Sequence, residues 1–304
     1  MRNSRSKHIV VILIWAFIGC LAAYFLYTAS QNGGISFEPT YTGEPTTTLS
    51  DVTLDKSITS VSIDWISGGV KIIPTTDDHI RIVEKAYKDI AKEKQLSLGL
   101  SGSALSIVSK NKTVFYFFGL MTSPTYLEVY LPISTSLDNF KLDGVSGSYK
   151  IDELYAELAQ INLTSGNLEF KNSYSTLLSL TMTSGNAVID DTQILTATIK
   201  MTSGKLDYKA DTNNLALTMT SGLADLEFGT TNPSAFKLNM TSGSANIRLN
   251  GPEAFSVTVD KTSGNFNPDF DYQKTDKTYA YKSGGPTYTI SVTSGNVDFT
   301  VAPQ

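Results

Sequence analysis

One tripeptide, Thr-Ser-Gly, recurs along the second half of the chain and constrains the fold more than any other feature. Its glycines are Gly166, Gly185, Gly204, Gly222, Gly243, Gly264 and Gly295, and Ser-Gly pairs ending at Gly68 and Gly147 precede them. From Gly147 to Gly264 the steps between successive glycines are about 18 to 21 residues long. Internal repeats of this length are typical of solenoids and other repeat arrays.

The residues around each glycine alternate between apolar and polar side chains. In the repeat of Gly185, Leu180 and Met182 precede the glycine at every second position, and Ala187 and Ile189 follow it in the same way. A period of two indicates strands, so each repeat is predicted to be a strand, a glycine corner and a second strand. The predicted fold class is all-β, a single-stranded β-solenoid with coils of about 19 to 21 residues and Thr-Ser-Gly corners.

Each coil is expected to stack on the next coil along the chain, because one coil cannot bury its own apolar row. Lys261 is an exception to the pattern, since it occupies an inward position before Gly264 where other repeats carry methionine. We expect a β-bulge at this point that turns the lysine outward. A buried lysine stem with its ammonium group reaching solvent is the alternative.

The repeats proper span residues 145–304, and residues 51–144 form a less regular part before them. The alternation is present around Gly68 but loosens after it, with a predicted hairpin over 96–108 and a strand over 127–131. We interpret this part as an irregular β entry or cap of the solenoid.

An apolar run within the cap exceeds what alternation requires. It contains Tyr116, Phe117, Phe118, Leu120 and Met121. Because repeat proteins need capped ends, we interpret it as a plug over the open end of the solenoid. An exposed loop that contacts a membrane or a partner is the alternative.

The N-terminal segment has the pattern of a membrane anchor. Residues 1–8 contain Arg2, Arg5 and Lys7, and residues 9–27 contain no charge. Such a run is long enough to span a bilayer, and the preceding basic residues place the tail in the cytoplasm. The sequence therefore predicts a transmembrane helix over 9–28, a flexible linker over 29–50, and a single-pass cell-membrane protein whose C-terminal body is extracytoplasmic. A cleaved signal peptide and a lipid-modified Cys20 are the alternatives.

Residues that could carry chemistry are few. The formal net charge of −5 argues against nucleic acid as a partner, and a single cysteine excludes an internal disulfide framework. The histidines, His8 and His79, have no nucleophile near them in sequence, and no metal-binding or phosphate-binding motif occurs. We therefore predict no catalytic residues, no metal site and no cofactor.

A broken row of carboxylates is predicted on one outer face. The third residue after the glycine is acidic in several repeats, as Glu169, Asp207, Asp225 and Asp298. Val188, Asn246 and Asn267 interrupt this row. We interpret it as a solvated face that discourages aggregation, with weak cation binding as the alternative.

Three stretches carry a resemblance to a known family: Asp-Trp-Ile-Ser-Gly-Gly-Val-Lys-Ile at 64–72, Leu-Glu-Val-Tyr-Leu-Pro at 127–132, and the Thr-Ser-Gly repeats. From about residue 57 onward the chain resembles the putative-adhesin family of β-strand repeat proteins, a domain of unknown function found in Gram-positive bacterial envelopes. The resemblance implies a β-repeat fold and brings no catalytic residues. Some members look like components of envelope-stress responses.

These observations favour a non-catalytic, membrane-anchored β-solenoid that acts as an adhesin-like interaction module of the cell envelope. Its expected partners are the cytoplasmic membrane through the N-terminal helix, envelope polymers or membrane proteins, and other copies of the chain end to end. One alternative is an envelope-stress sensor that binds a peptide or lipid. A polysaccharide-acting β-helix enzyme is another, although the short steps between glycines leave little loop for a catalytic cleft.

Overall fold

The computed structural model describes residues 43–55, 57–111, 124–251, 253–283 and 285–302. This part of the chain consists of β-strands and one short 3-10 helix, η1 (Lys92–Lys94), so the all-β prediction is confirmed. The strands are β1 (Thr47–Leu54), β2 (Ser60–Thr75), β3 (Ile80–Ala86), β4 (Ser97–Ser101), β5 (Ala104–Val108), β6 (Thr125–Pro132), β7 (Leu137–Asp152), β8 (Tyr155–Leu163), β9 (Asn167–Lys171), β10 (Tyr174–Met182), β11 (Asn186–Met201), β12 (Lys205–Met219), β13 (Leu223–Phe228), β14 (Ala235–Met240), β15 (Ser244–Leu249), β16 (Phe255–Lys261), β17 (Asn265–Asp269), β18 (Gln273–Thr275), β19 (Thr278–Tyr281), β20 (Thr287–Val292) and β21 (Asn296–Val301).

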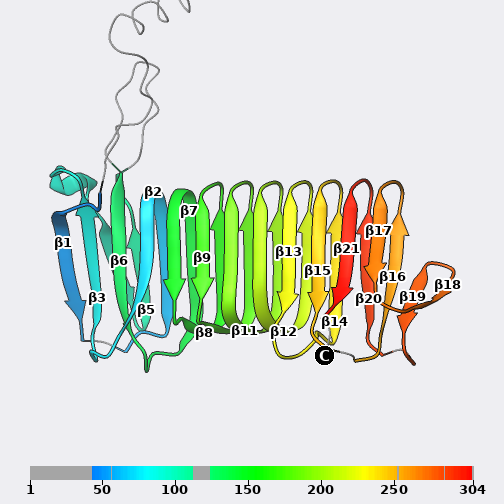
Figure 1. The fold of residues 1–304 in the computed structure, drawn as a ribbon. Helices are drawn as coiled ribbons and strands as arrows, with labels where there is room; N and C mark the ends of the chain where they lie inside the picture. Colours follow the sequence, from blue (N-terminus) through cyan, green and yellow to red (C-terminus); the bar gives the residue numbers. More distant parts are fainter. Residues whose placement is uncertain (1–42, 56, 112–123, 252, 284, 303–304) are drawn as a thin grey trace, which may run out of the picture. The chain divides into compact units, whose positions relative to one another are not determined.

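The repeats place their strands in two rows that meet at the glycine corners (Figure 1). We call the strands that lead into a glycine the first row; they include β8, β10, β14, β20 and β16. The strands that follow a glycine form the second row, with β9, β13, β15, β21 and β17. The long strands β2, β7, β11 and β12 bend and contribute to both rows.

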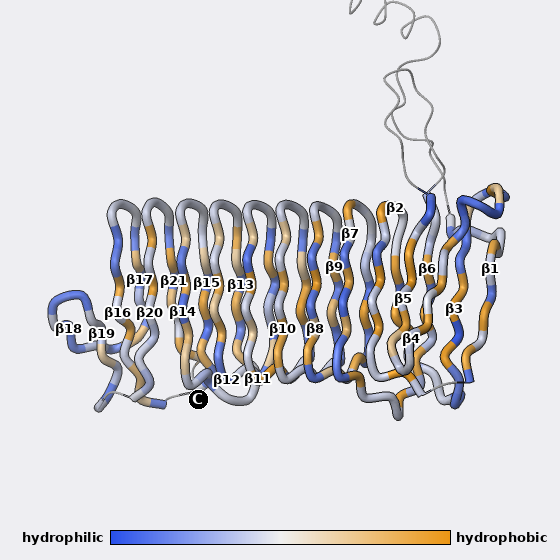
Figure 2. Tube along the Cα trace, turned by 180° about the vertical axis from the view of Figure 1, so that it is seen from behind, coloured by the Kyte–Doolittle hydropathy of each residue, from blue (hydrophilic) through white to orange (hydrophobic). Residues whose placement is uncertain are grey.

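Equivalent strands of the repeats pair in parallel and in register. Met182 lies beside Met201, Met201 beside Met219, and Met219 beside Met240. Each of these side chains is 3% exposed or less, because the inward positions of the two rows face each other and exclude water. Figure 2 shows the resulting alternation of hydrophobic and hydrophilic positions along the strands.

The corner glycines stack directly on one another. All nine predicted corner glycines have a positive φ, for example +115° at Gly204. A Cβ atom added to Gly204 would lie 1.9 Å from the carbonyl oxygen of Gly185. That oxygen accepts a hydrogen bond from the backbone N–H of Lys205 at 3.0 Å. Any side chain at the corner would therefore separate the coils.

The order in which the coils stack differs from the order along the chain. β20 and β21 pair on one side with β14 and β15, and on the other side with β16 and β17. The coil of Gly295 is thus inserted between the coils of Gly243 and Gly264. The hairpin of β18 and β19 makes this return path: β19 pairs antiparallel with β16 before the chain turns back. The expectation that each coil stacks on the next coil along the chain is wrong at this end.

The insertion also explains Lys261, for which the bulge prediction is wrong. The residues from Ser256 to Lys261 pair with β20 without a break in register. Lys261 is exposed, and its Nζ donates a hydrogen bond to the carbonyl oxygen of Gly264 at 3.2 Å. Because this coil is the outermost of the stack, the inward position next to its corner borders solvent and tolerates a lysine.

The irregular part before the repeats adds strands to the outer side of β2. β5 runs parallel to the first half of β2, and β6 runs parallel to the second half. The predicted hairpin is confirmed as β4 with β5, and the predicted strand at 127–131 lies within β6. β1 begins at Thr47, inside the predicted flexible linker, because its residues pair antiparallel with β3.

The predicted transmembrane helix and the apolar run of Tyr116 to Met121 lie outside the described residues. Among the residues that the structure describes, no helix is long and apolar enough to cross a membrane. The predicted single-pass location with the N-terminus inside depends on such a helix, and the described residues give it no support.

Candidate functional site

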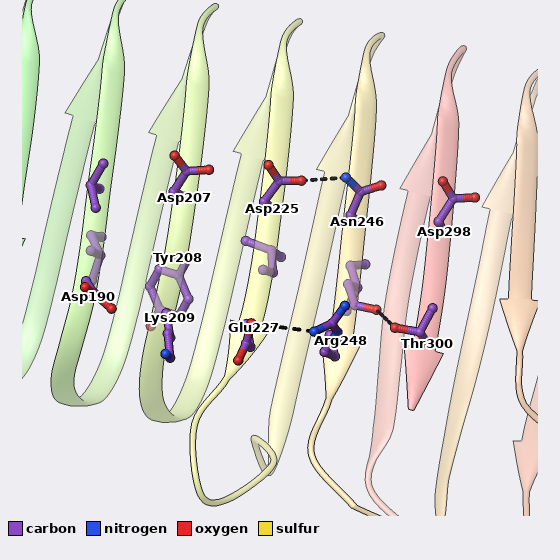
Figure 3. Close-up of a pocket in the computed structure, with 14 residues that line it drawn as sticks. Asp190, Asp207, Tyr208, Lys209, Asp225, Glu227, Asn246, Arg248, Asp298 and Thr300 are labelled. Carbon is purple, nitrogen blue, oxygen red and sulfur yellow. Dashed lines mark hydrogen bonds and ion pairs between the residues drawn. The ribbon is translucent and has the colours of Figure 1, made fainter. Parts of the chain in front are cut away.

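The outer face of the second row is hollowed into a groove of about 630 Å³ that crosses β11, β12, β13, β15 and β21 (Figure 3). Two columns of outward side chains line it. The third residues after the corner glycines are Val188, Asp207, Asp225, Asn246 and Asp298, and the fifth residues are Asp190, Lys209, Glu227, Arg248 and Thr300. We call this feature the polar groove. The residues between them on the same strands point inward and fill the core. Because side chains alternate along a strand, both columns point outward.

A second hollow of about 440 Å³ extends the polar groove away from the glycine corners. It shares Lys209, Glu227 and Arg248 with the groove and ends at the turn after β13. There, Asp211 accepts hydrogen bonds from the backbone N–H and the hydroxyl of Thr230. The turn that borders the groove is thus held by a side chain of the neighbouring coil.

The carboxylates of the first column have partners on their own coil or on the adjacent one. Lys205 Nζ lies 2.7 Å from an Asp207 oxygen and 3.4 Å from an Asp225 oxygen, and the bond to Asp207 raises the pKa of Lys205. Asn246 donates an amide hydrogen bond to Asp225. These contacts offset the repulsion between carboxylates on neighbouring strands.

Asn267 pairs with Asp298 in the same way, through an amide hydrogen bond of 2.7 Å. In the sequence, Asn246 and Asn267 interrupt the acidic row. In the structure, the inserted coil places Asp298 between them. Along the stack, Asn246 therefore follows Asp225, and Asn267 follows Asp298. The two asparagines belong to the row as hydrogen-bond donors.

The second column alternates in charge. Asp190, Lys209, Glu227 and Arg248 are neighbours in the strand register, with signs that change at each step. Arg248 Nη1 lies 3.9 Å from a Glu227 oxygen, and the two side chains are 63% and 49% exposed. The column therefore presents both carboxylates and cations to a bound molecule.

The part of the chain that the structure describes contains no group of three or more His, Cys, Asp or Glu residues that could hold a metal ion. His79 does not line the polar groove; its Nδ1 lies 3.2 Å from an oxygen of Asp55.

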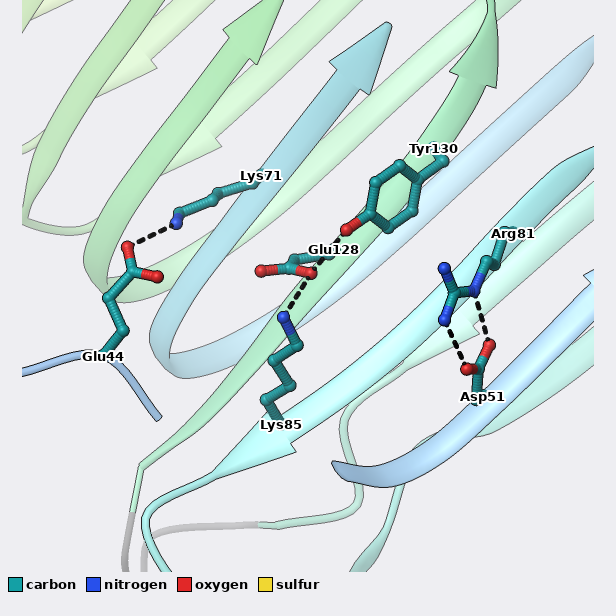
Figure 4. Close-up of polar contacts among 7 residues, drawn as sticks. All are labelled: Glu44, Asp51, Lys71, Arg81, Lys85, Glu128 and Tyr130. Carbon is teal, nitrogen blue, oxygen red and sulfur yellow. Dashed lines mark hydrogen bonds and ion pairs between the residues drawn. The ribbon is translucent and has the colours of Figure 1, made fainter. Parts of the chain in front are cut away.

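A second polar cluster joins β1, β3 and β6 (Figure 4). Arg81 holds Asp51 through two hydrogen bonds of 2.8 and 2.6 Å. Lys85 lies 2.7 Å from a Glu128 oxygen, which also accepts the hydroxyl hydrogen of Tyr130 at 2.9 Å. Burial alone would raise the pKa of Glu128, but Lys85 and Tyr130 outweigh it and the pKa is lowered. The cluster ties three strands together and leaves no reactive group unpaired.

Glu84 is a buried carboxyl group that the sequence reasoning did not assign. It is fully buried on the core side of β3, where its Oε2 accepts the backbone N–H of Leu96 at 2.7 Å. Burial raises the pKa of Glu84, and the hydrogen bond from the Leu96 N–H counteracts only part of this effect. The period-two alternation could have indicated this burial, because Glu84 follows Ile80 and Ile82 at the inward positions of the same strand.

The fold and the site together define an all-β repeat protein whose two rows of strands meet at glycine corners and display polar ladders. The chain belongs to the Toastrack DUF4097 family, whose model matches residues 58–300. The family resemblance drawn from the repeats is thereby confirmed. No curated protein is similar enough in sequence to count as a match.

Several solved structures are similar to the chain. One is described as a putative lipid binding protein from Parabacteroides distasonis, with 14% identity, a TM-score of 0.49, and coverage of 86% of this chain and 98% of that one. A putative adhesin from Bacteroides fragilis has 12% identity, a TM-score of 0.46, and coverage of 83% and 97%. A putative cell adhesion protein from Clostridium sporogenes has 9% identity, a TM-score of 0.30, and coverage of 85% and 100%.

Proposed function

We propose that the protein is a non-enzymatic, adhesin-like interaction module of the cell envelope that binds a polymer along the polar groove. One observation carries the proposal: the same two outward positions of five stacked coils line a single open groove. A polymer with repeating groups would meet an equivalent side chain on each coil. Many weak contacts of this kind add up to strong binding.

The chemistry of the two columns favours an envelope glycan that carries both hydroxyl and charged groups. Successive coils are about 4.8 Å apart, close to the length of one sugar residue in an extended polysaccharide. The carboxylates and amides of the first column can accept and donate hydrogen bonds to hydroxyl groups. The alternating charges of Glu227 and Arg248 suit a polymer with both amino and carboxyl groups, as in peptidoglycan.

We further propose that the repeats form one continuous β-solenoid with coils of about 19 to 21 residues. The parallel register of β8, β10, β11 and β12 supports this, because each inward residue lies beside its equivalent in the next repeat. Such a solenoid keeps the groove columns straight, which a polymer-binding surface requires.

The competing enzyme hypothesis finds little support in the groove. Glycoside hydrolysis uses a pair of carboxyl groups in different environments, one neutral and one ionised. Here Asp207 and Asp225 share the ammonium group of Lys205 and are 40% and 37% exposed. Nothing sets either carboxyl group apart as a proton donor.

An alternative function is a sensor that binds a lipid or peptide, and one surface feature favours it. Tyr155, Tyr174, Leu177 and Leu195 are exposed large apolar side chains on the neighbouring strands β8, β10 and β11. Flotation of the protein with phospholipid vesicles tests this function. Leu177→Asp should abolish flotation if these residues bind lipid, and vesicles that bind nothing would exclude a lipid ligand.

Co-sedimentation of the full chain with isolated peptidoglycan tests the proposed function. Arg248→Glu reverses one charge in the polar groove and should lower the bound fraction several-fold. Lys237→Glu makes the same change on an exposed position of β14, in the first row, and should leave binding unchanged. Equal losses in both variants would contradict a role for the groove, and release of sugar fragments by the wild-type chain would favour the enzyme.

A further inference from the structure

The described part of the fold has four edge strands. β1, β4, β17 and β18 each pair with one neighbour only, namely β3, β5, β21 and β19. An edge strand presents unpaired backbone N–H and C=O groups, to which another strand can add. Soluble proteins usually block such edges with charges, prolines or short strands.

Three of these edges are blocked and one is open. β1 carries Asp51, which Arg81 holds in place, and β17 contains Pro268, which has no N–H, followed by Asp269. β18 is only three residues long and includes Lys274. β4 has neither charge nor proline, and it is exposed from Gly99 to Ser101.

We propose that β4 is the docking edge for a second copy of the same chain. Its sequence, Ser-Leu-Gly-Leu-Ser, reads the same in both directions. Antiparallel pairing about a two-fold axis at Gly99 therefore places Leu98 beside Leu100 of the second copy, and Ser97 beside Ser101 of the second copy. An interface of this kind uses the same surface on both subunits and is self-complementary.

The leucines of β4 gain most from this pairing. Leu98 pairs with Ile107 and Leu100 with Leu105, and both partners are buried core residues. The leucines thus lie on the core side of the edge, but Leu100 remains 43% exposed. A second copy would cover Leu100 with its own Leu98 and continue the apolar layer across the axis.

Gly99 is not required by the fold of a single chain. Its φ is not in the left-handed region, and an added Cβ would meet only the Ser106 Cβ at 3.7 Å, an ordinary contact. Glycine in a strand weakens the strand and often marks a close backbone approach. Two strands crossing a two-fold axis at this residue provide such an approach.

The blocked edges at the other end of the stack limit the assembly to two chains. Because β17 and β18 resist pairing, a chain that has docked through β4 offers no second open edge within the described residues. Self-association is therefore expected to stop at a closed dimer.

Disulfide trapping in the full chain tests the pairing and its register. In a Cys20→Ser background, Gly99→Cys should give a disulfide-linked dimer under mild oxidation, because directly opposite residues of antiparallel strands lie within disulfide range. Ser97→Cys and Ser101→Cys should cross-link when the two variants are mixed, and much less when each is alone. Thr218→Cys, exposed on the first row, is the matched control.

A Gly99→Cys chain that cross-links no more than Thr218→Cys would overturn the proposal. Efficient cross-linking of Ser97→Cys alone would also overturn it, because that result requires another register. As an independent measurement, Leu100→Lys should convert the dimer to a monomer in sedimentation velocity, and this monomer should still unfold cooperatively. A chain that is monomeric without this substitution would refute the dimer.

Discussion

At the scale of single residues, the corner glycines are the positions at which the fold tolerates no alternative. Gly204 combines a φ of +115° with backbone contact to the coil of Gly185, so a methyl group there meets a carbonyl oxygen that cannot move by itself. Gly102 is a matched comparison, since it has a φ of +62° and open space around its Cβ position.

Gly204→Ala should lower the free energy of unfolding by about 3 to 5 kcal/mol, through strain and the separation of two coils. Gly102→Ala should cost only about 1 to 2 kcal/mol, the strain of a left-handed residue alone. Urea unfolding measures both. Similar losses would show that coil contact at the corner contributes little.

Glu84 predicts a pH dependence of stability. Burial raises its pKa in the folded chain above that in the unfolded chain. Between the two values the folded chain binds more protons, so the free energy of unfolding falls as the pH rises from about 4.5 through the folded pKa. Glu84→Gln cannot ionise and should show a smaller fall.

Glu128→Gln is the control with the opposite sign. Because the pKa of Glu128 is lowered in the folded chain, its contribution to stability is present at neutral pH and is lost as the pH falls below its ordinary value. This variant should lose stability at pH 7 and little at pH 3. If the free energy of unfolding changed with pH in the same way for the wild type and for Glu84→Gln, the account of Glu84 would be contradicted.

At the scale of strands and coils, the sequence predicts the interior of a coil but not the order of the stack. Alternation around each glycine is local, so the strands, their inward faces and the corners could be assigned from it. The number of residues from Gly243 to Gly264 is similar to the other steps between corner glycines. The local sequence therefore does not reveal that another coil lies between these two in the stack.

The same limit applies to the polar groove. The acidic row is visible in the sequence as a repeat position, but Asn246 and Asn267 stand in the sequence as interruptions of this row. Their role as donors to Asp225 and Asp298 depends on the stacking order. Ion pairs such as Arg81 with Asp51 were also missed, because their strands pair through tertiary contacts.

The inserted coil predicts how a truncated chain behaves. Deleting residues 287–304 removes the carbonyl groups to which the backbone N–H groups of Thr262 and Asn265 donate, those of Val292 and Gly295. Hydrogen exchange at these amides should therefore accelerate strongly. The amide of Thr241, which donates to Met219, keeps its acceptor and should stay protected. Retained protection at Thr262 would mean that the last two coils can stack directly.

At the scale of the whole molecule, the repeats allow the contribution of a coil to stability to be measured apart from its contribution to binding. Each coil contacts mainly its two neighbours, so stability is nearly a sum over coils and one coil can be removed without a new fold. The polar groove, in contrast, occupies only the coils from β11 to β21. Two deletions of similar length therefore separate the contribution of the groove from that of the stack.

Deleting residues 167–185 removes one coil outside the groove, and deleting residues 205–222 removes the coil that carries Asp207 and Lys209. Both deletions join equivalent corner positions, so both proteins should fold and melt cooperatively at similar temperatures. Binding to peptidoglycan in the co-sedimentation assay should survive the first deletion. The second deletion shortens both columns by one contact and should weaken binding several-fold without abolishing it, because the remaining coils still act together. Complete loss after the second deletion would instead point to one essential residue, which is the behaviour expected of a catalytic site.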